Sequence, residues 1–359
     1  MIHTGIKGSK KRIIAAVLTV IMALAVPGFL AGCGADKQAG AENAGTVVEE
    51  TADYVIVVDQ AGREVTIKKD VESIAFCYRV VARFLLSLDQ GDKIKGMGKT
   101  EAFLEELQPS LKDAADVGKG VADIEALAEL KPDLFIHKAS DSETLEAVEA
   151  IGIPALGIDV ETPDDMITAL KLMGLACGAG EKADKLIDWY QTSIAEAQEL
   201  TEGIKDRKTA IIMGSSIGKV ADPTMLQGRM LEIAGAENPA DIQASELWPT
   251  AGTEMIFKWN PDYIFISGSE GSVYTAQDLY SDDAWSEMKA VKNRHIYTIP
   301  AAEDSWEFPG TVSALGVNYM MHVMYPELMS REELDESVKE FYKLSYGRSY
   351  DLESLDVKW

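Results

Sequence analysis

Two periods of hydrophobic residues alternate along most of this chain. Short apolar runs such as SIAFCY, DLFIHK and TAIIMG are each followed by a stretch in which apolar residues return every three to four positions. Strands that alternate with helices are typical of βαβ units that form a parallel sheet. The pattern therefore predicts an α/β fold, with one lobe over residues 54–162 and a second lobe over residues 206–359.

Residues 163–205, between the predicted lobes, have a helical pattern only. Thr162 is a good N-cap and Pro163 suits the first helical position, so a helix is expected to begin there. From Glu181 onward, no glycine or proline interrupts the sequence until Gly203. A helix of that length spans roughly 35 Å, which is long enough to connect two lobes.

The first lobe is expected to begin with a β-hairpin. YVIVV and REVTIK each alternate apolar and polar residues, and the DQAG segment between them has the composition of a turn. Residues 33–53, which precede the hairpin, are mostly small, polar and acidic and lack an apolar period. That composition predicts a flexible tether.

The N-terminal segment of residues 1–32 has the pattern of an export signal. Basic residues up to Arg12 precede a nearly unbroken apolar run from Ile13 to Leu30. The letters LAGC, which end with Cys33, resemble a bacterial lipobox, in which this cysteine becomes the lipidated first residue. An N-terminal transmembrane anchor is the alternative, because the run is about long enough to span a bilayer. Both alternatives place the rest of the chain outside the cytoplasm.

The chain is strongly acidic, with a formal net charge of -25 at pH 7. Such a surface repels nucleic acids and anionic lipid headgroups, so no nucleic-acid partner is expected. An anionic small molecule needs a local basic patch on this protein. With Cys33 lipidated, only Cys77 and Cys177 remain, and we expect two buried thiols, with a single disulfide between them as the alternative.

One sequence unit occurs twice. IEALAELKPDLFI at residues 124–136 and TEMIFKWNPDYIFI at residues 253–266 each place a glutamate seven positions before Pro-Asp and an apolar run. The proline ends a short helix and the run after it has the composition of a buried strand. Glu125 and Glu254 are therefore expected at the rim of their lobes, one in each. Stabilisation of the helix dipole, worth about 0.3–1 kcal/mol, is the alternative role for both.

These features together resemble a known family. The lipobox, the hairpin, the single long helix, both glutamate units, AVKNRHIYTIP and SWEFPGTVSALG follow one another as in the substrate-binding lipoproteins of iron-complex (siderophore), cobalamin and haem ABC importers. The resemblance covers nearly all of residues 54–330. It implies two Rossmann-like lobes joined by one long α-helix, the helical-backbone periplasmic-binding-protein fold. It also implies that Glu125 and Glu254 form salt bridges with arginines of the permease dimer, which works with an ATPase.

Ligand contacts are expected from loops that follow the strands and face the gap between the lobes. The first lobe offers Phe76, Tyr78, Arg79, Lys99, His137 and Lys138, and the second offers Ser215, Ser216, Trp248, Ser267 and Trp306. Aromatic rings with arginine and lysine suit a bulky, partly apolar anion, and a ferric siderophore fits that description. Haem, cobalamin, molybdate and tungstate are alternative ligands that the resemblance allows.

Several alternatives stay open at this point. Phe76 and Tyr78 have a second interpretation as aromatics at the edge of the core, and His137 is either a direct ligand of a metal or haem or an ordinary loop histidine. One histidine without cysteine or acid at ligand spacing does not predict a zinc-type site, so no resident cofactor is expected. The sequence contains no HExxH and no GxGxxG motif, and we expect no enzyme. A monomeric surface receptor that senses a ligand is the main rival to a monomeric binding protein that feeds an importer.

Overall fold

The computed structural model describes residues 43–98, 102–242, 247–268 and 272–359. The expectations for the export signal of residues 1–32, for Cys33 and for Lys99 therefore lie outside the described residues.

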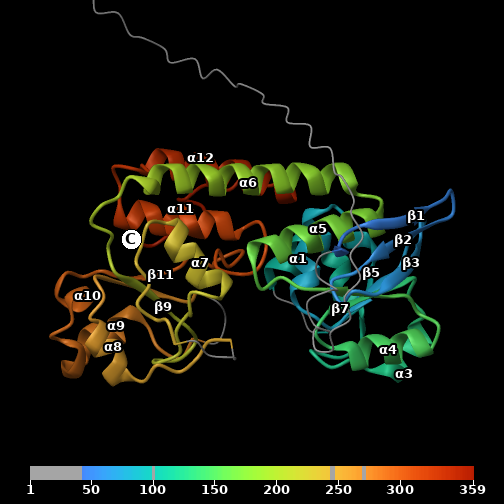
Figure 1. The fold of residues 1–359 in the computed structure, drawn as a ribbon, viewed down its shortest axis with the longest axis horizontal. Coiled ribbons are helices and arrows are strands. Elements are labelled where there is room, and N and C mark those ends of the chain that lie inside the picture. Colours follow the sequence, from blue (N-terminus) through green and yellow to red (C-terminus); the bar gives the residue numbers. More distant parts are fainter. Residues whose placement is uncertain (1–42, 99–101, 243–246, 269–271) are drawn as a thin grey trace, which may run out of the picture. The chain divides into compact units, whose positions relative to one another are not determined.

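An antiparallel sheet opens the described chain (Figure 1). It contains β1 (Val47–Glu50), β2 (Tyr54–Val58) and β3 (Glu64–Lys68), in the order β1-β2-β3. The predicted hairpin is confirmed as β2 and β3, whose alternate valine and isoleucine side chains are buried. The tether predicted for residues 33–53 is wrong over Val47–Glu50, because this segment pairs with β2. All four side chains of β1 are exposed, which explains why it carries no apolar period.

The first lobe contains a parallel sheet in the order β6-β5-β4-β7-β8. Its strands are β4 (Ile74–Phe76), β5 (Ile94–Met97), β6 (Ala115–Asp116), β7 (Leu134–Lys138) and β8 (Ala155–Ile158). The helices that connect them are α1 (Val80–Ser87), α2 (Ala102–Leu107), α3 (Ile124–Leu130) and α4 (Ser142–Ala150). From β4, the sheet extends on one side through β5 and β6 and on the other side through β7 and β8. This lobe is therefore doubly wound and Rossmann-like.

The second lobe repeats the arrangement on a smaller scale. Its parallel sheet has the order β11-β10-β9, formed by β9 (Ala210–Met213), β10 (Tyr263–Ile266) and β11 (Ile296–Thr298). The helices along these strands are α7 (Leu226–Ile233), α8 (Thr253–Trp259), α9 (Ala276–Ser281) and α10 (Lys289–Lys292). The prediction of an α/β fold is thus confirmed in both lobes.

Long helices link the two sheets. They are α5 (Pro163–Cys177), α6 (Gly180–Glu202), α11 (Ser313–Met324) and α12 (Arg331–Tyr346). The Thr162 hydroxyl accepts a hydrogen bond from the backbone N–H of Asp165, so the predicted N-cap of α5 is confirmed. Helix α6 has 23 residues and packs against α5, α7, α11 and α12 (Figure 1). The single long connecting helix is therefore confirmed.

One hydrophobic core extends through both lobes. It includes residues of β2, β3, β4, α1, α5 and α6 together with residues of α7, α11 and α12. Within it, the ring of Trp189 on α6 lies 5.1 Å from the ring of Phe341 on α12, between their centroids. Smaller clusters cover the outer face of each sheet. Because packed cores resist deformation, the shared cluster couples the positions of the two lobes.

A buried ion pair joins the lobes inside this core. Arg83 of α1 donates from Nε to Oδ1 of Asp304 at 2.6 Å, and the two side chains are 5% and 1% exposed. The hydroxyl of Tyr346 donates to Oδ2 of the same carboxylate at 2.9 Å. Burial raises the pKa of Tyr346 well above its usual value and Asp304 raises it further, so the phenol stays protonated as a donor. The guanidinium of Arg83 also lies 4.2 Å from the ring centroid of Phe308.

The repeated Pro-Asp unit has the same bonding in both lobes. Oδ2 of Asp133 accepts from the backbone N–H groups of Glu72 and Ser73, just before β4, at 2.9 and 3.0 Å. Oδ2 of Asp262 accepts from the backbone N–H and the hydroxyl of Thr209, just before β9, at 3.1 and 2.9 Å. The hydroxyls of Ser73 and Thr209 accept in return from the backbone N–H of each aspartate. Each aspartate therefore fixes the start of the neighbouring parallel strand.

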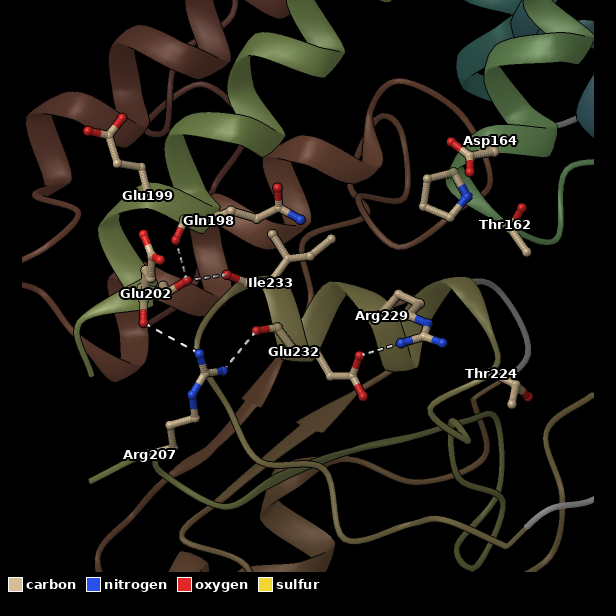
Figure 2. Close-up of a pocket in the computed structure, with 12 residues that line it drawn as sticks. Thr162, Asp164, Gln198, Glu199, Glu202, Arg207, Thr224, Arg229, Glu232 and Ile233 are labelled. Atoms are coloured by element: carbon tan, nitrogen blue, oxygen red, sulfur yellow. Dashed lines mark hydrogen bonds and ion pairs between the residues drawn. The ribbon is translucent and has the colours of Figure 1, made fainter. Parts of the chain in front are cut away.

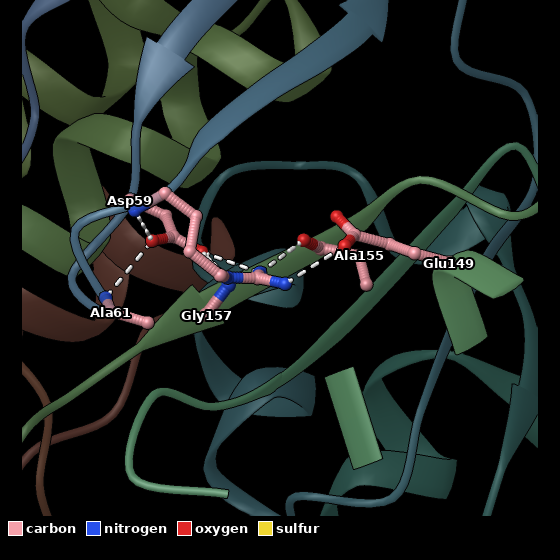
Figure 3. Close-up of polar contacts among 6 residues, drawn as sticks. Asp59, Ala61, Glu149, Ala155 and Gly157 are labelled. Atoms are coloured by element: carbon pink, nitrogen blue, oxygen red, sulfur yellow. Dashed lines mark hydrogen bonds and ion pairs between the residues drawn. The ribbon is translucent and has the colours of Figure 1, made fainter. Parts of the chain in front are cut away.

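A second buried network attaches the hairpin to the first lobe (Figure 3). The carboxylate of Asp59 in the hairpin turn is fully buried and accepts from Arg63 and from the backbone N–H of Gly157 on β8. Arg63 also donates to the backbone oxygen of Ala155 at 2.6 Å. A Cβ at position 157 would lie 2.9 Å from Oδ2 of Asp59, so glycine permits this close approach.

We predict that replacing Asp133 or Asp262 with asparagine changes stability mainly above pH 4. Burial raises the pKa of each carboxyl, but hydrogen bonds lower it by more, from Lys68, Glu72 and Ser73 to Asp133 and from Thr209 and Lys289 to Asp262. A lowered pKa in the folded state contributes stability above the unfolded value of about 3.9 and loses it as the pH falls through the folded value.

Urea unfolding midpoints between pH 2 and pH 7 measure this contribution. Asp133→Asn and Asp262→Asn should flatten the acid-dependent slope, while the exposed control Asp206→Asn should keep the slope of the unmodified protein. Unchanged slopes in both test variants would show that the two aspartates do not stabilise the strand starts as charged groups.

We predict that Arg83→Met destabilises the protein by about 3–5 kcal/mol, because it leaves the Asp304 carboxylate buried without its cation. The double variant Arg83→Met with Asp304→Leu should recover most of that loss, since no buried charge remains. Denaturant unfolding of both single variants and the double variant gives the coupling energy. A coupling energy near zero would contradict the proposed connection between the lobes.

Candidate functional site

A cavity of about 160 Å³ is lined by residues of both lobes. The first lobe supplies Arg79, Arg83, Ala102 and Phe103, and the second supplies Gly268, Ala301, Ala302, Glu303, Ser305 and Phe308. These residues follow the carboxyl ends of β4, β5, β10 and β11. In open parallel sheets, ligands bind outside the carboxyl ends of the strands, so this cavity is the first candidate for the site.

The cavity carries positive charge on one wall. The guanidinium groups of Arg79 and Arg83 lie 5.6 and 4.2 Å from the ring centroid of Phe308. Arg79 is exposed, whereas Arg83 is held by the buried carboxylate of Asp304. Arginine over an aromatic face presents a planar, oriented cation for charge-assisted hydrogen bonds. This is the local basic patch that the sequence analysis requires for an anionic ligand.

An acidic residue, Glu303, also lines the cavity. Burial raises the pKa of Glu303 and the nearby Glu106 raises it further, while Arg348 lowers it. Because its pKa is raised, Glu303 is protonated to a greater extent than an ordinary glutamate at the same pH. A site of this kind attracts an anion at Arg79 and offers a carboxyl for hydrogen bonding at Glu303.

The volume of the cavity limits what it encloses. Pockets for drug-sized molecules usually have about 300–1,000 Å³, so this cavity accommodates one end of a larger ligand or a small oxyanion. All of its lining residues belong to the described part of the chain.

A larger groove of about 900 Å³ lies between α5, α6 and α7 (Figure 2). Its arginines are already engaged, because Arg229 pairs with the Glu232 carboxylate at 2.8 Å and Arg207 donates to backbone oxygens of Thr201 and Glu232. The acidic side chains of Asp164, Glu199 and Glu202 also line it. The groove has the volume for a chelate, but its charge disfavours an anion, so the cavity beside Arg79 is the better candidate.

Five other predicted residues reach the surface, four of them at the carboxyl ends of strands and Trp248 in the segment before α8. Ser215 is exposed, whereas Tyr78, Lys138, Ser216 and Trp248 are half-buried. Lys138 pairs with Glu161 at 3.3 Å. Trp248 has a φ of +54°, and its ring lies where a Cβ on Gly214 would stand. A role for these five in ligand binding stays a prediction, and Arg79 is the predicted residue that lines the cavity.

Three further predicted residues are buried in this structure, and their contact with a ligand stays a prediction. Phe76 and Trp306 are each 1% exposed and belong to the shared core, where the indole N–H of Trp306 donates to the Tyr342 hydroxyl at 3.3 Å. Ser267 is 3% exposed and its hydroxyl is hydrogen-bonded to the Glu307 carboxylate. Aromatic residues next to a strand end contribute more by packing into the core than by facing the gap.

His137 is also buried, with 2% exposure, and its contact with a ligand between the lobes stays a prediction. Its Nδ1 lies 3.2 Å from Sγ of Cys77 and its Nε2 lies 2.9 Å from Oδ2 of Asp141. Cys77 and Cys177 are both free and buried, as expected. Among the described residues, no group of three or more histidine, cysteine and acidic side chains is arranged to hold a metal ion.

Sequence reasoning missed Arg83 and Phe308. Arg83 lies inside VVARFLLS, a helix whose residues are all buried, and a single arginine in such an apolar stretch signals a buried partner. Phe308 follows Trp306 and Glu307 in a segment considered only for its tryptophan. The distance in sequence between Arg83 and Asp304, 221 residues, explains why no local pattern connects them.

The two glutamates occupy equivalent positions. Glu125 and Glu254 are the second residues of α3 and α8, two helices of seven residues each, and both side chains are exposed. Both helices end at a residue in the left-handed region, Lys131 with φ +51° and Asn260 with φ +46°. Among the described residues, neither glutamate has an ion-pair partner in the structure. Docking to a permease therefore stays a prediction.

Comparison with known proteins identifies the fold and class. A family model described as "Periplasmic binding protein" matches residues 74–303. An uncharacterised ABC transporter substrate-binding lipoprotein, YvrC of Bacillus subtilis, is 28% identical over 315 residues, which cover 83% of this chain and 94% of that protein. The iron-uptake system-binding protein of B. subtilis is 24% identical over 302 residues, 80% of this chain and 90% of the relative.

A solved structure gives the same fold. The molybdate-bound periplasmic protein MolA of Haemophilus influenzae superposes with a TM-score of 0.73 at 20% identity, covering 82% of this chain and 99% of MolA. Within the described residues, no helix is long and apolar enough to cross a membrane. Proteins of this family bind substrates for ABC importers and are not enzymes, and they work with a permease and its ATPase. The chain therefore belongs to the periplasmic binding protein family, as a substrate-binding protein of ABC importers.

Proposed function

We propose that this protein captures a chelated metal outside the cytoplasm, with a ferric siderophore as the favoured ligand, and delivers it to an ABC importer permease. The observation that carries the proposal is the pair of arginines over Phe308, where strand ends of both lobes meet. A ferric siderophore presents anionic oxygens at its edge and apolar surface beside them. Arg79 supplies a charge-assisted donor for the oxygens, and Phe308 and Phe103 supply apolar contact.

A small oxyanion such as molybdate is the second candidate ligand. The volume of the cavity favours it, because about 160 Å³ encloses a small oxyanion more completely than a chelate. Haem and cobalamin stay alternative ligands of the same class. A surface receptor that senses the same ligand remains the alternative to import, since the fold does not fix the function.

The proposed location is the outer face of the cell membrane or the periplasm. Lipidation at Cys33 would anchor a monomer there, and YvrC, a relative of this chain, is a lipoprotein. The proposed docking partner is a permease dimer, contacted through Glu125 on one lobe and Glu254 on the other. The matched positions and the exposure of the two glutamates support this role, because a two-fold partner needs one equivalent anchor on each lobe.

We predict that one ferric chelate quenches the tryptophan fluorescence of the full chain in mild detergent with saturable, micromolar or tighter affinity. The panel contains ferric hydroxamate, ferric catecholate, haemin, cobalamin and molybdate. Saturation by molybdate alone would support the second candidate. Binding of haemin or cobalamin alone would contradict the siderophore proposal and leave the family assignment intact.

The variant Arg79→Gln should weaken that binding by about 10-fold or more, since a hydrogen bond to a charged group contributes about 1.5–3 kcal/mol. The matched control is Arg229→Gln, which removes an arginine from the larger groove. Equal losses in both variants, or a loss only in Arg229→Gln, would place the ligand in the groove instead.

We predict that Glu125→Lys combined with Glu254→Lys abolishes uptake in cells and leaves ligand affinity within about twofold, since exposed charges far from a site are screened. The control is Glu146→Lys with Asp283→Lys, which makes the same change in charge at two other exposed positions, one in each lobe. Radioactive ligand uptake and fluorescence titration measure the two effects separately. Reduced affinity, or an equal loss of uptake in the control, would rule out the docking role.

A further inference from the structure

One cluster of metal-ligating side chains lies outside the candidate site. Cys77 follows β4, His137 belongs to the adjacent strand β7, and Asp141 is the N-cap of α4. Sγ of Cys77 lies 3.2 Å from Nδ1 of His137, and Nε2 of the same ring lies 2.9 Å from Oδ2 of Asp141. The thiol and the imidazole are both buried, with 5% and 2% exposure. None of these three residues lines the cavity beside Arg79.

The carboxylate fixes the tautomer of the imidazole. Asp141 accepts from the backbone N–H of Thr144 at 3.1 Å and from its hydroxyl at 2.8 Å. The Asp141 carboxylate is thus already an acceptor for Thr144, and the same Oδ2 faces Nε2 of His137 at 2.9 Å. Nε2 of His137 therefore carries the hydrogen that Asp141 accepts. The lone pair of Nδ1 consequently points at the Cys77 thiol.

We propose that Cys77 and His137 form a two-ligand site for a soft monovalent cation of the copper(I) class. Thiolate and imidazole are both ligands that such a cation prefers. A histidine that binds a metal almost always donates its other ring N–H to a carboxylate or carbonyl, and Asp141 provides that partner. Zinc would need four ligands, and the described neighbourhood does not supply them.

Replacement of the Cys77 thiol proton by a monovalent cation leaves the net charge of the site unchanged. The S–H bond of Cys77 breaks, a bond between sulfur and the cation forms, and the proton passes to solvent. One positive charge replaces another, so the buried site gains no net charge and needs no third ligand to compensate it. Breaking the S–H bond and forming the sulfur–cation bond require no oxidant or reductant, because the cation keeps its oxidation state.

The geometry requires a small movement. Metal–sulfur and metal–nitrogen bonds of about 2.3 and 2.0 Å place the two donor atoms roughly 4.3 Å apart in a linear arrangement. The observed separation is 3.2 Å, so the pair must open by about 1 Å. Rotation of the Cys77 side chain about its single carbon–carbon torsion provides that movement, while Asp141 keeps the imidazole in place.

Cys177 is a matched internal control. Burial raises the pKa of Cys77 to about 11 and that of Cys177 to about 12, so both thiols are protonated at neutral pH. The ionisable neighbour of Cys177 in the described residues is Lys93, whose ammonium donates to the Cys177 backbone oxygen at 3.0 Å. An imidazole that faces the thiol distinguishes Cys77. The inference does not depend on which ligand the protein transports.

Silver(I) is the probe, because it has the same preference as copper(I) and does not change oxidation state. The full chain in mild detergent carries Cys33→Ser throughout and is titrated under argon with excess free methionine to mask thioethers. One silver ion per chain should be retained after desalting in this background and in Cys177→Ser. Cys77→Ser should retain none. His137→Gln should bind at least 10-fold more weakly.

Asp141→Asn keeps both donor atoms and tests the positioning role of the carboxylate. It should weaken silver binding by about 10-fold or more, because loss of an outer partner commonly costs that much. In ¹⁵N spectra of His137, silver should shift the Nδ1 resonance and leave Nε2 protonated. Denaturant unfolding of each variant shows that it is folded before its affinity is compared.

Three results would overturn the inference. Equal silver affinity in His137→Gln and in the protein that retains His137 would mean that the Cys77 thiol binds silver alone. Retention that is lost in Cys177→Ser and kept in Cys77→Ser would place the ion at the wrong thiol. Absence of retained silver in the Cys33→Ser background, with an unshifted Nδ1 resonance, would show that no site exists.

Discussion

The ion pair between Arg83 and Asp304 is the constraint on which the binding site depends. It joins the first helix of one lobe to the loop after the last strand of the other, within a core that both lobes share. A buried ion pair loses its hydration, and that cost is offset only when further contacts satisfy both charges. Tyr346 satisfies the carboxylate and Phe308 lies against the guanidinium. The same arginine lines the cavity, so the interaction that holds the lobes also shapes the site.

The sequence unit that occurs twice contains an aspartate with a structural role and a glutamate with a proposed functional role. The aspartate of each Pro-Asp pair is bonded to the start of the neighbouring strand, and its loss would loosen the sheet. The glutamate seven positions before the proline is exposed in both lobes. A residue that is repeated in both lobes but does little for stability is a reasonable anchor for a two-fold partner. The same unit thus supplies one residue for folding and one exposed residue that we propose for docking.

Much of the fold could be predicted from the sequence because it depends on local patterns. The alternation of strands and helices, the N-cap Thr162 and the 23-residue helix α6 all follow from periods and caps that neighbouring residues define. Strand β6 has two residues and β1 has four exposed ones, so neither carries a hydrophobic period. Both escaped prediction for that reason.

The site was harder to predict because burial at a strand end depends on residues far away in the sequence. A rule that selects residues after strands found Arg79, but it also selected Phe76, Trp306, Ser267 and His137, which are buried. Whether an aromatic or a histidine faces the gap or the core is decided by the helices packed above it. Arg83 was missed for the same reason, since its partner lies in the other lobe.

The central claim is that the ligand binds where the strand ends of both lobes meet. Anomalous X-ray diffraction at the absorption edge of the bound metal, from crystals grown with the chelate that saturates the protein, tests it most directly. The account predicts a metal peak beside the cavity, with Arg79 and Phe308 among the nearest side chains. A peak in the groove beside Thr162 and Arg229 would contradict it.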